Sequence, residues 1–219
     1  MMLPGARMFF ERRGAPTPPL PYDYAVEYIE TDGVASYIDT GITPELSTYK
    51  VVTRFQVISV ANPSQTSLAG NNIFGAASGA NPLFQRMSFI GRPSDAVFRT
   101  QSPNLSSSPY PVFDNNIHDI SFDSTALVFD GTPHAVNATT NTCGHLCLGT
   151  RGSFPASTNP QNFYTQTRFY GFKIYDGDNH VFDGIPVVAN GLAGLYDSIS
   201  GTVKTNAAAT GTITAGPRV

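Results

Sequence analysis

The sequence predicts an all-β protein, built as an antiparallel β-sandwich, and three observations carry this prediction. Charged residues make up 13% of the chain, about half the usual share of roughly 25%, while the chain holds 20 glycines and 17 prolines. Short stretches that alternate apolar and polar residues recur along it, with turn residues between them. No segment has a convincing helical period. Many short strands separated by turns are typical of sandwiches and jelly rolls.

Residues 1–22 differ in composition from residues 23–219, which we expect to form a single sandwich domain. The first segment is basic, whereas the whole chain carries a net charge of −3, and its prolines favour an extended polyproline conformation. Two alternatives follow: a disordered tail, or an extended arm that docks on a partner protein. In a docked arm, apolar side chains anchor the segment and arginines pair with carboxylates. These anchoring residues are Arg7, Met8, Phe9, Phe10, Arg12 and Arg13.

Alternation predicts several strands in the first half of the chain, and residues 49–60 give the clearest one. Its apolar face is formed by Tyr49, Val51, Phe55 and Val57, and charged or amide side chains share the other face. The other strands predicted here cover residues 24–30, 37–41, 73–75 and 83–90, the last of them ended by residues 91–93.

The second half of the chain predicts hairpins joined by two long polar loops, at residues 101–116 and 150–166. Residues 117–131 form one hairpin, with Ile120 and Phe122 on the same face of its first arm. Short strands are also predicted at residues 146–149, 194–197, 201–206 and 211–214. Loops as long as these two are typical of functional or partner-covered segments.

Residues 167–186 predict the hairpin around which the rest of the domain is organised. Tyr170, Phe172 and Ile174 alternate with charged residues or glycine, as in a half-buried strand. Residues 176–179 supply the turn, and Pro186 is expected to end the returning strand or to place it at a sheet edge. The residues expected to be buried in the core are Tyr49, Val51, Phe55, Tyr170, Phe172 and Ile174.

Composition also argues against several functions. The net charge of −3 argues against nucleic-acid binding, and no apolar run approaches the ~18–20 residues that span a bilayer. The N-terminus lacks the apolar run of a signal peptide, so we expect folding in a cytoplasm. Cys143 and Cys147, the two cysteines, do not make a disulfide framework.

Catalysis is not expected either. Glycoside hydrolysis, which some sandwich folds perform, needs two carboxylates ~5–9 Å apart. The glutamates all lie in the first quarter of the chain, and Asp123 is expected to begin a turn rather than to pair with Asp119. His118 and several serines form no local motif that positions a nucleophile. The sequence therefore predicts no catalytic residues.

Two segments carry donor atoms that suit metals. Cys143, His145 and Cys147 share one strand face, but neighbours on such a face lie about 7 Å apart, too far for three ligands on one zinc ion. We interpret them as two buried thiols and a surface histidine. Residues 176–179 have oxygen ligands for calcium but lack further carboxylates, which favours a plain turn. No metal and no other cofactor is expected.

Three segments resemble a family of phage and prophage proteins. VEYIETDGVASYIDTGI (residues 26–42), RFYGFKIYDGDNHVFDGIPV (residues 168–187) and GLYDSISGTVKTN (residues 194–206) are similar to successive parts of the family pattern. Gly216 and Pro217 also fit, and residues 117–131 are similar to a hairpin of laminin-G-like domains. The chain departs from the pattern at residues 150–166, which are longer, and at Gly184, where the pattern favours a bulkier residue.

The resemblance implies a concanavalin A-like or laminin-G-like jelly roll with an extended N-terminal arm. Members of the family occur in virion proteins of phages, notably those that infect gut bacteria of the Bacteroides type. The implied function is that of a virion structural protein, such as a capsid decoration, head-fibre or tail-associated protein, assembled in the host cytoplasm. Its implied partners are other virion proteins, bound through the arm, and further copies of itself; no nucleic-acid or membrane partner is expected.

Carbohydrate binding is the alternative function, with a host-surface or mucin glycan as the partner. Sugar sites stack sugars on exposed aromatic rings beside polar side chains, and both long loops contain such residues. The residues expected to bind a glycan are Tyr110, Asn115, Asn116, Asn162 and Tyr164. The opposing interpretation is that these aromatic residues pin the loops to the sandwich; tryptophan, the commonest sugar platform, is absent.

Overall fold

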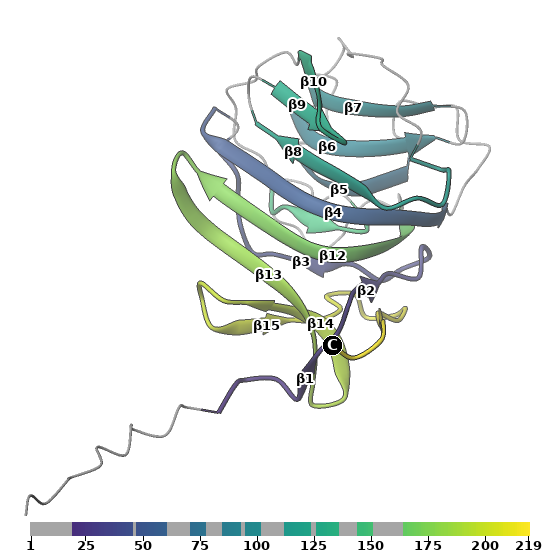
Figure 1. Ribbon diagram of the computed structural model, residues 1–219, viewed down its shortest axis with the longest axis vertical. Coiled ribbons are helices and arrows are strands. Elements are labelled where there is room, and N and C mark those ends of the chain that lie inside the picture. The colour runs from purple at the N-terminus through teal and green to yellow at the C-terminus, as the bar shows by residue number, and fades with distance from the viewer. Residues whose placement is uncertain are drawn as a thin grey trace, which may run out of the picture.

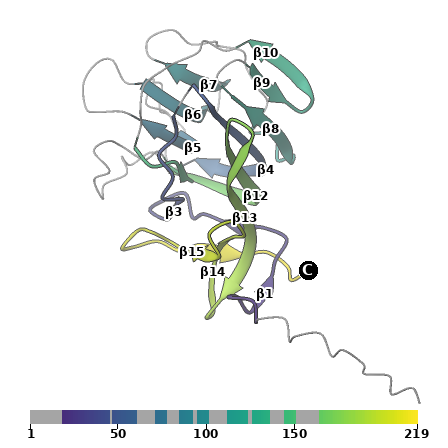
Figure 2. The same ribbon diagram turned by 90° about the vertical axis from the view of Figure 1, so that its left-hand side faces the viewer.

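The computed structural model describes residues 19–45, 47–60, 71–77, 85–92, 95–101, 112–123, 126–135, 144–150 and 164–219. Within these ranges the chain forms strands and turns and no helix, so the predicted all-β class is confirmed. Two antiparallel sheets pack as a sandwich (Figures 1 and 2). None of the described segments is a helix long and apolar enough to cross a membrane.

The larger sheet is centred on β4 (Tyr49–Val60) and β12 (Thr165–Asp176), which pair along their whole length. Its main path runs in the order β10 (Thr132–Ala135), β9 (Ala126–Phe129), β8 (His118–Phe122), β4, β12, β13 (Asn179–Ala189), β14 (Leu192–Asp197) and β15 (Thr202–Lys204). Short strands join its side: β1 (Tyr24–Ala25) pairs with β13, and β2 (Ile29–Glu30) pairs with β12 and with β16 (Thr214–Ala215).

The smaller sheet covers one face of the larger one. It runs in the order β3 (Ile38–Asp39), β11 (Cys147–Leu148), β5 (Asn71–Ala77), β6 (Gln85–Arg92) and β7 (Asp95–Gln101). In Figure 2, β5, β6 and β7 stand on one side, and β8 and β9 stand opposite them. The space between these two layers is therefore where the apolar side chains are enclosed.

Aromatic rings from both sheets meet in the main core. The Phe74 ring of β5 contacts the Phe172 ring of β12 edge-on, with centroids 5.4 Å apart. Pairs of this geometry contribute about 0.5–1.5 kcal/mol beyond the area they bury. The same cluster includes Val51, Phe55, Val57, Ile73, Ile120, Phe122, Leu148, Phe169, Ile174, Phe182 and Leu195.

The central strands confirm most of the predicted core. β4 has the predicted bounds, and the paired hairpin of β12 and β13 lies where residues 167–186 predict it. Side chains with no exposed surface include Val51, Phe55, Phe172 and Ile174, as predicted. Tyr49 differs, because it lies at the end of β4 and is half-buried against the cluster.

A β-bulge at Tyr170 changes which residues of β12 face the core. Phe169 pairs with Phe55 of β4 and Gly171 pairs with Arg54, so Tyr170 is the extra residue between the two pairs. An extra residue shifts the alternation of a strand by one position. Phe169 is therefore fully buried and Tyr170 only half-buried, which corrects the predicted burial of Tyr170.

Pro186 does not end the returning strand, contrary to the prediction. β13 continues to Ala189, and Pro186 pairs with Leu195 of β14. The carbonyl of Pro186 accepts a hydrogen bond of 3.0 Å from the N–H of Val26. In an antiparallel strand the N–H and C=O of one residue point to the same side. The side of Pro186 that lacks an N–H is therefore the side toward the junction of β12 and β1. The hydrogen bonds between β13 and β14 do not need that N–H, so this ladder stays intact.

The strand predicted at residues 24–30 is divided in two because its halves have different partners. β1 pairs with β13 at Val187 and Val188, whereas β2 pairs with β12 and β16. Between them Val26 bridges to Arg218 near the C-terminus. The buried residues of this stretch, Val26 and Ile29, are three positions apart, so strict alternation does not describe its burial across the change of partner.

Candidate functional site

The outer face of the larger sheet, formed by β8, β4, β12 and β13, carries paired charges. Arg54 on β4 donates two hydrogen bonds to the Asp119 carboxylate on β8, at 2.9 and 2.7 Å. On the other side, Lys173 of β12 lies 3.3 Å from the Asp183 carboxylate of β13. Each pair joins residues that oppose one another across neighbouring strands. The strand alternation that buries the apolar residues places these side chains on the outside.

A shallow groove of about 280 Å³ lies between these pairs. Its lining includes Thr53, Arg54, Asp119, Tyr170, Gly171 and Lys173. The bulge in β12 turns the Tyr170 side chain to the outer face, and Gly171 beside it has no side chain to fill the space. The Thr53 hydroxyl donates a 2.7 Å hydrogen bond to the Gly171 carbonyl, which fixes the backbone under the groove.

Tyr170 belongs to a group of aromatic and polar side chains that holds its ring in place. The rings of Tyr28 and Tyr170 have centroids 5.3 Å apart, and the Arg168 guanidinium lies 4.6 Å from the centre of the Tyr28 ring. Arg168 also donates a 2.6 Å hydrogen bond to the Glu30 carboxylate. Burial raises the pKa of the Tyr170 hydroxyl, so this group stays protonated, and it donates a 3.4 Å hydrogen bond to Gln56 Oε1.

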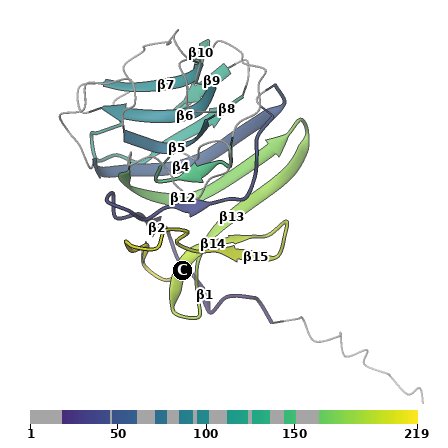
Figure 3. The same ribbon diagram turned by 180° about the vertical axis from the view of Figure 1, so that it is seen from behind.

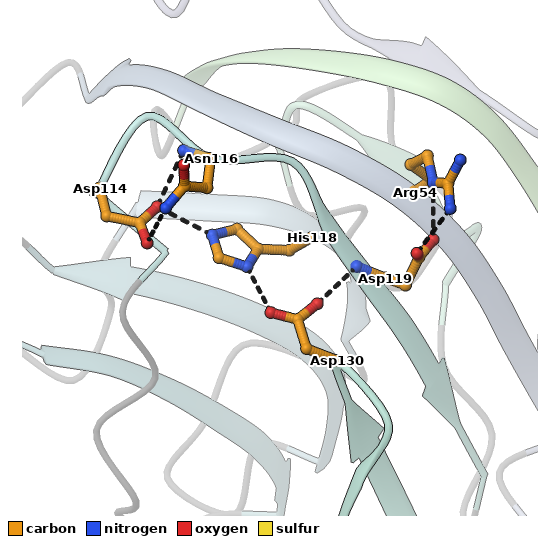
Figure 4. A network of polar contacts seen from close by, with 6 residues as sticks. All are labelled: Arg54, Asp114, Asn116, His118, Asp119 and Asp130. Atoms are coloured by element: carbon orange, nitrogen blue, oxygen red, sulfur yellow. Dashed lines mark hydrogen bonds and ion pairs between the residues drawn. The ribbon is translucent and has the colours of Figure 1, made fainter.

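A buried histidine at the start of β8 supports one wall of the groove (Figure 4). His118 Nδ1 lies 2.8 Å from an Asp130 oxygen, and His118 Nε2 lies 3.0 Å from an Asp114 oxygen. Its ring stacks on Phe129, with centroids 4.9 Å apart. The second Asp130 oxygen accepts a 2.8 Å hydrogen bond from the N–H of Asp119. This chain of contacts ends at the backbone of Asp119, the residue whose carboxylate pairs with Arg54.

Each ring nitrogen of His118 contacts a carboxylate oxygen, one of Asp130 and one of Asp114. The pKa of Asp114 is low: burial raises it, but hydrogen bonds from Asn116 and the contact with His118 outweigh burial. With both nitrogens engaged, His118 is not arranged as a general base for a nucleophile.

The turn before β8 holds two of the residues predicted to bind a glycan. Asn115 adopts a positive φ of 62°, and its carbonyl accepts a hydrogen bond from Gln56. The Asn116 side chain donates a 2.7 Å hydrogen bond to the Asp114 carboxylate. Both residues are exposed, at the end of β8 nearest His118.

The other predicted glycan residues are not beside them. The Tyr164 ring is 9% exposed and packs with Tyr37 and Cys147, whereas a sugar platform needs an open ring face. Tyr110 and Asn162 lie outside the described residues, and so do the predicted arm residues Arg7, Met8, Phe9, Phe10, Arg12 and Arg13.

Cys147 and His145 occupy the places expected of a thiol and a surface histidine. Cys147 is 3% exposed, and burial raises the pKa of its thiol well above the usual value, so the sulfur stays neutral. His145 Nδ1 lies 3.1 Å from an Asp39 carboxylate oxygen. Cys143 lies outside the described ranges, within which no three His, Cys, Asp or Glu side chains are grouped to hold a metal ion.

No model of a known protein family matches the sequence, and no curated protein is significantly similar to it. The groove was not among the predicted sites. The alternation of residues predicts Tyr170 in the core, and it gives Arg54, Asp119 and Lys173 no role beyond that of solvent-facing charged residues. The available signal is the Tyr-Gly pair in the middle of a strand, since an interior glycine often marks a bulge.

Proposed function

We propose that this protein is a structural protein of a phage particle, attached to other virion proteins through the N-terminal segment and projecting its sandwich outward. The segments that carry the family resemblance support the proposal. They supply β2 and β3, most of the β12–β13 hairpin at the centre of the larger sheet, and most of β14 with β15 beside it. The jelly-roll connectivity that the resemblance implies is part of this proposal.

The observation that carries the proposal is where the chain enters and leaves the sandwich. β1 pairs with β13, and the N–H of Val219 donates a 3.2 Å hydrogen bond to the Ala25 carbonyl. Both described ends of the chain therefore lie at one end of the molecule, with β7 and β10 at the other (Figures 1 and 3). A particle bound through residues 1–22 would hold this end and leave the opposite end facing solvent.

Exposed apolar side chains gather near the same end. Leu20 is 60% exposed, Leu192 at the start of β14 59%, and Val219 78%. Beside Leu192 lies a groove of about 330 Å³, also lined by Asn206 and Ile213. Exposed apolar surface with a polar surround is typical of protein-contact sites. It supports contact with a capsid or fibre-base protein rather than a free surface.

Deletion of residues 1–20 tests the attachment. We expect the shortened protein to stay folded by circular dichroism and to be lost from purified particles. Leu192→Ser is expected to lower incorporation, whereas Ile117→Ser, which alters an apolar residue 48% exposed just before β8, is not. Normal incorporation of the shortened protein would overturn attachment through the arm.

Carbohydrate binding is the second candidate function. The observation that favours it is the outer-face groove, where an aromatic side chain, Tyr170, stands between two charged pairs.

A further inference from the structure

We infer that the groove between β8, β4 and β12 binds one unit of an uncharged saccharide, with Tyr170 as its wall and Arg54 and Asp119 as its hydrogen-bonding groups. This inference rests on the second candidate function, carbohydrate binding, and names its site and ligand class. It places the ligand on the sheet face, away from the polar loops in which the sequence predicts glycan residues.

The size and position of the groove fit a small unit of a longer chain. Its volume of about 280 Å³ lies at the lower limit of the ~300–1,000 Å³ typical of pockets that enclose drug-sized molecules. It lies on an open face of the sheet rather than in the core, because its lining includes Val52, Arg54 and Lys173, which alternate with the buried residues of β4 and β12. A polymer can therefore seat one ring here and continue over the sheet on either side.

The side chains around the groove present both donors and acceptors. Arg54 and Asp119 are 58% and 59% exposed, so their outer atoms remain open to a ligand while they bind one another. A sugar hydroxyl donates one hydrogen bond and accepts others, which matches a guanidinium beside a carboxylate. The Tyr170 ring adds an apolar surface with a protonated hydroxyl at its edge.

The balance of charge selects an uncharged ligand. Arg54 is neutralised by Asp119, and Lys173 is neutralised by Asp183. An acidic sugar or a phosphate would meet the Asp119 carboxylate or would have to separate an ion pair, and like charges placed together oppose binding. A cation would meet Arg54 and Lys173 in the same way. A neutral polyhydroxyl compound incurs neither cost.

The packing around Gly171 does not require a glycine at this position. A Cβ added at Gly171 would meet only the Gly184 carbonyl oxygen within 4 Å, at 3.7 Å, which is an ordinary contact. At Gly184 and Gly194, by contrast, an added Cβ would collide with Phe182 and with the Lys204 backbone. Glycine within a strand is destabilising relative to alanine. Its presence at an unobstructed position is explained if the missing side chain keeps the groove open.

Titration of the full-length protein with defined sugars tests the inference. The neutral probes are cellotriose, mannotriose and triacetylchitotriose, and sialyllactose is the acidic comparison. Binding is monitored by heteronuclear NMR with up to ~10 mM sugar, a range in which a Kd near 1 mM is still measured. We expect at least one neutral probe to bind and to shift the signals of residues 170–173. Gly171→Val, which fills the groove, and Tyr170→Ala, which removes its wall, should each weaken binding about tenfold or more.

Control variants separate this site from its alternatives. Thr202→Val, at an exposed strand position of β15, should bind as the parent does, and an unchanged melting temperature shows that Gly171→Val is folded. If Gly171→Val fails to fold, Gly171→Ala takes its place. Binding that survives both groove variants but is lost in Asn116→Ala would overturn the groove and keep carbohydrate binding at the turn before β8.

Two further results would overturn the inference. Binding of sialyllactose alone would contradict the uncharged class of ligand. Absence of binding by every probe would remove the saccharide site, while leaving virion attachment to be decided by incorporation of the shortened protein.

Discussion

The two faces of the larger sheet are built from the same strands and follow different rules. On the inner face, Phe55 of β4 and Phe172 of β12 have no exposed surface and belong to the apolar core cluster. On the outer face, Arg54 and Lys173 of the same two strands are paired with carboxylates and half-open to water. The inner face determines which fold forms, and the outer face is free to specify what the folded protein contacts.

Two glycines, one on each face of the larger sheet, show the same difference between the faces. Gly184 lies on the inner face, where an added Cβ would come within 2.7 Å of the Phe182 ring and 3.1 Å of the Leu195 side chain. Gly171 lies on the outer face with ordinary contact distances around it. The bulkier residue that the family pattern favours at position 184 therefore has no room here, because Phe182 and Leu195 already fill that space.

The largest effect expected from this comparison is at the centre of the inner face. Phe172→Ala should lower the free energy of unfolding by about 3–5 kcal/mol, since it removes a fully enclosed ring and leaves a cavity. Denaturant unfolding measures the change. Ile185→Ala, on the outer side of β13, is the control and should change it by less than about 1 kcal/mol. Equal effects of the two substitutions would remove the distinction between the faces.

Alanine at the two glycines should give opposite results. Gly184→Ala is expected to lower the free energy of unfolding by about 1–3 kcal/mol, because the core is already full at that position. Gly171→Ala is expected to leave it unchanged or to raise it by about 0.4–1 kcal/mol through the loss of freedom in the unfolded chain. Thermal unfolding of the two variants, measured under the same conditions, tests this difference. A destabilised Gly171→Ala variant would show that the groove has no room for an added methyl group.

Just after β2, the Asp32 carboxylate holds the chain by hydrogen bonds rather than by apolar contacts. Burial raises the pKa of Asp32, but hydrogen bonds from the N–H groups of Ala35, Ser36, Val34 and Thr212 outweigh it and bring the pKa to about 2. A lowered folded-state pKa gives stability that is present above the unfolded pKa of ~3.9 and is lost as the pH falls toward 2.

This carboxylate should make unfolding pH-dependent in acid. We expect about 1–2 kcal/mol of stability to disappear between pH 4 and pH 2, allowing for partial exposure. Asp32→Asn should flatten that part of the profile, whereas Asp178→Asn, in an exposed turn, should not. An identical slope in the parent and in Asp32→Asn would contradict the assignment.

The smallest effect is expected on the outer face. A double-mutant cycle of Arg54→Ala and Asp119→Ala should give a coupling free energy of about 0.2–1 kcal/mol, because both side chains are exposed and their attraction is screened. High salt should reduce it further. A coupling above about 2 kcal/mol would mean that this pair stabilises the fold as strongly as a core contact does.

Period-two alternation was sufficient to predict the fold class, the bounds of β4 and the burial of Val51 and Phe172. These features depend on residues near one another in the chain. The bulge at Tyr170 depends on how residues 165–176 align with residues 49–60. The continuation of β13 past Pro186 depends on the N–H of Val26, which donates a hydrogen bond to the Pro186 carbonyl. The groove follows from the bulge, so it could not be predicted before the register was known.

The pairing of β4 with β12 also has a consequence for synthesis of the protein. More than a hundred residues separate these strands, so the central ladder cannot close until the ribosome has released residue 176. Until then β4 offers a free edge of apolar strand, and such edges readily recruit strands of other chains. Domains rich in contacts of this kind fold in milliseconds to seconds rather than microseconds. Slower translation or a lower growth temperature should therefore raise the soluble yield more than any surface substitution would.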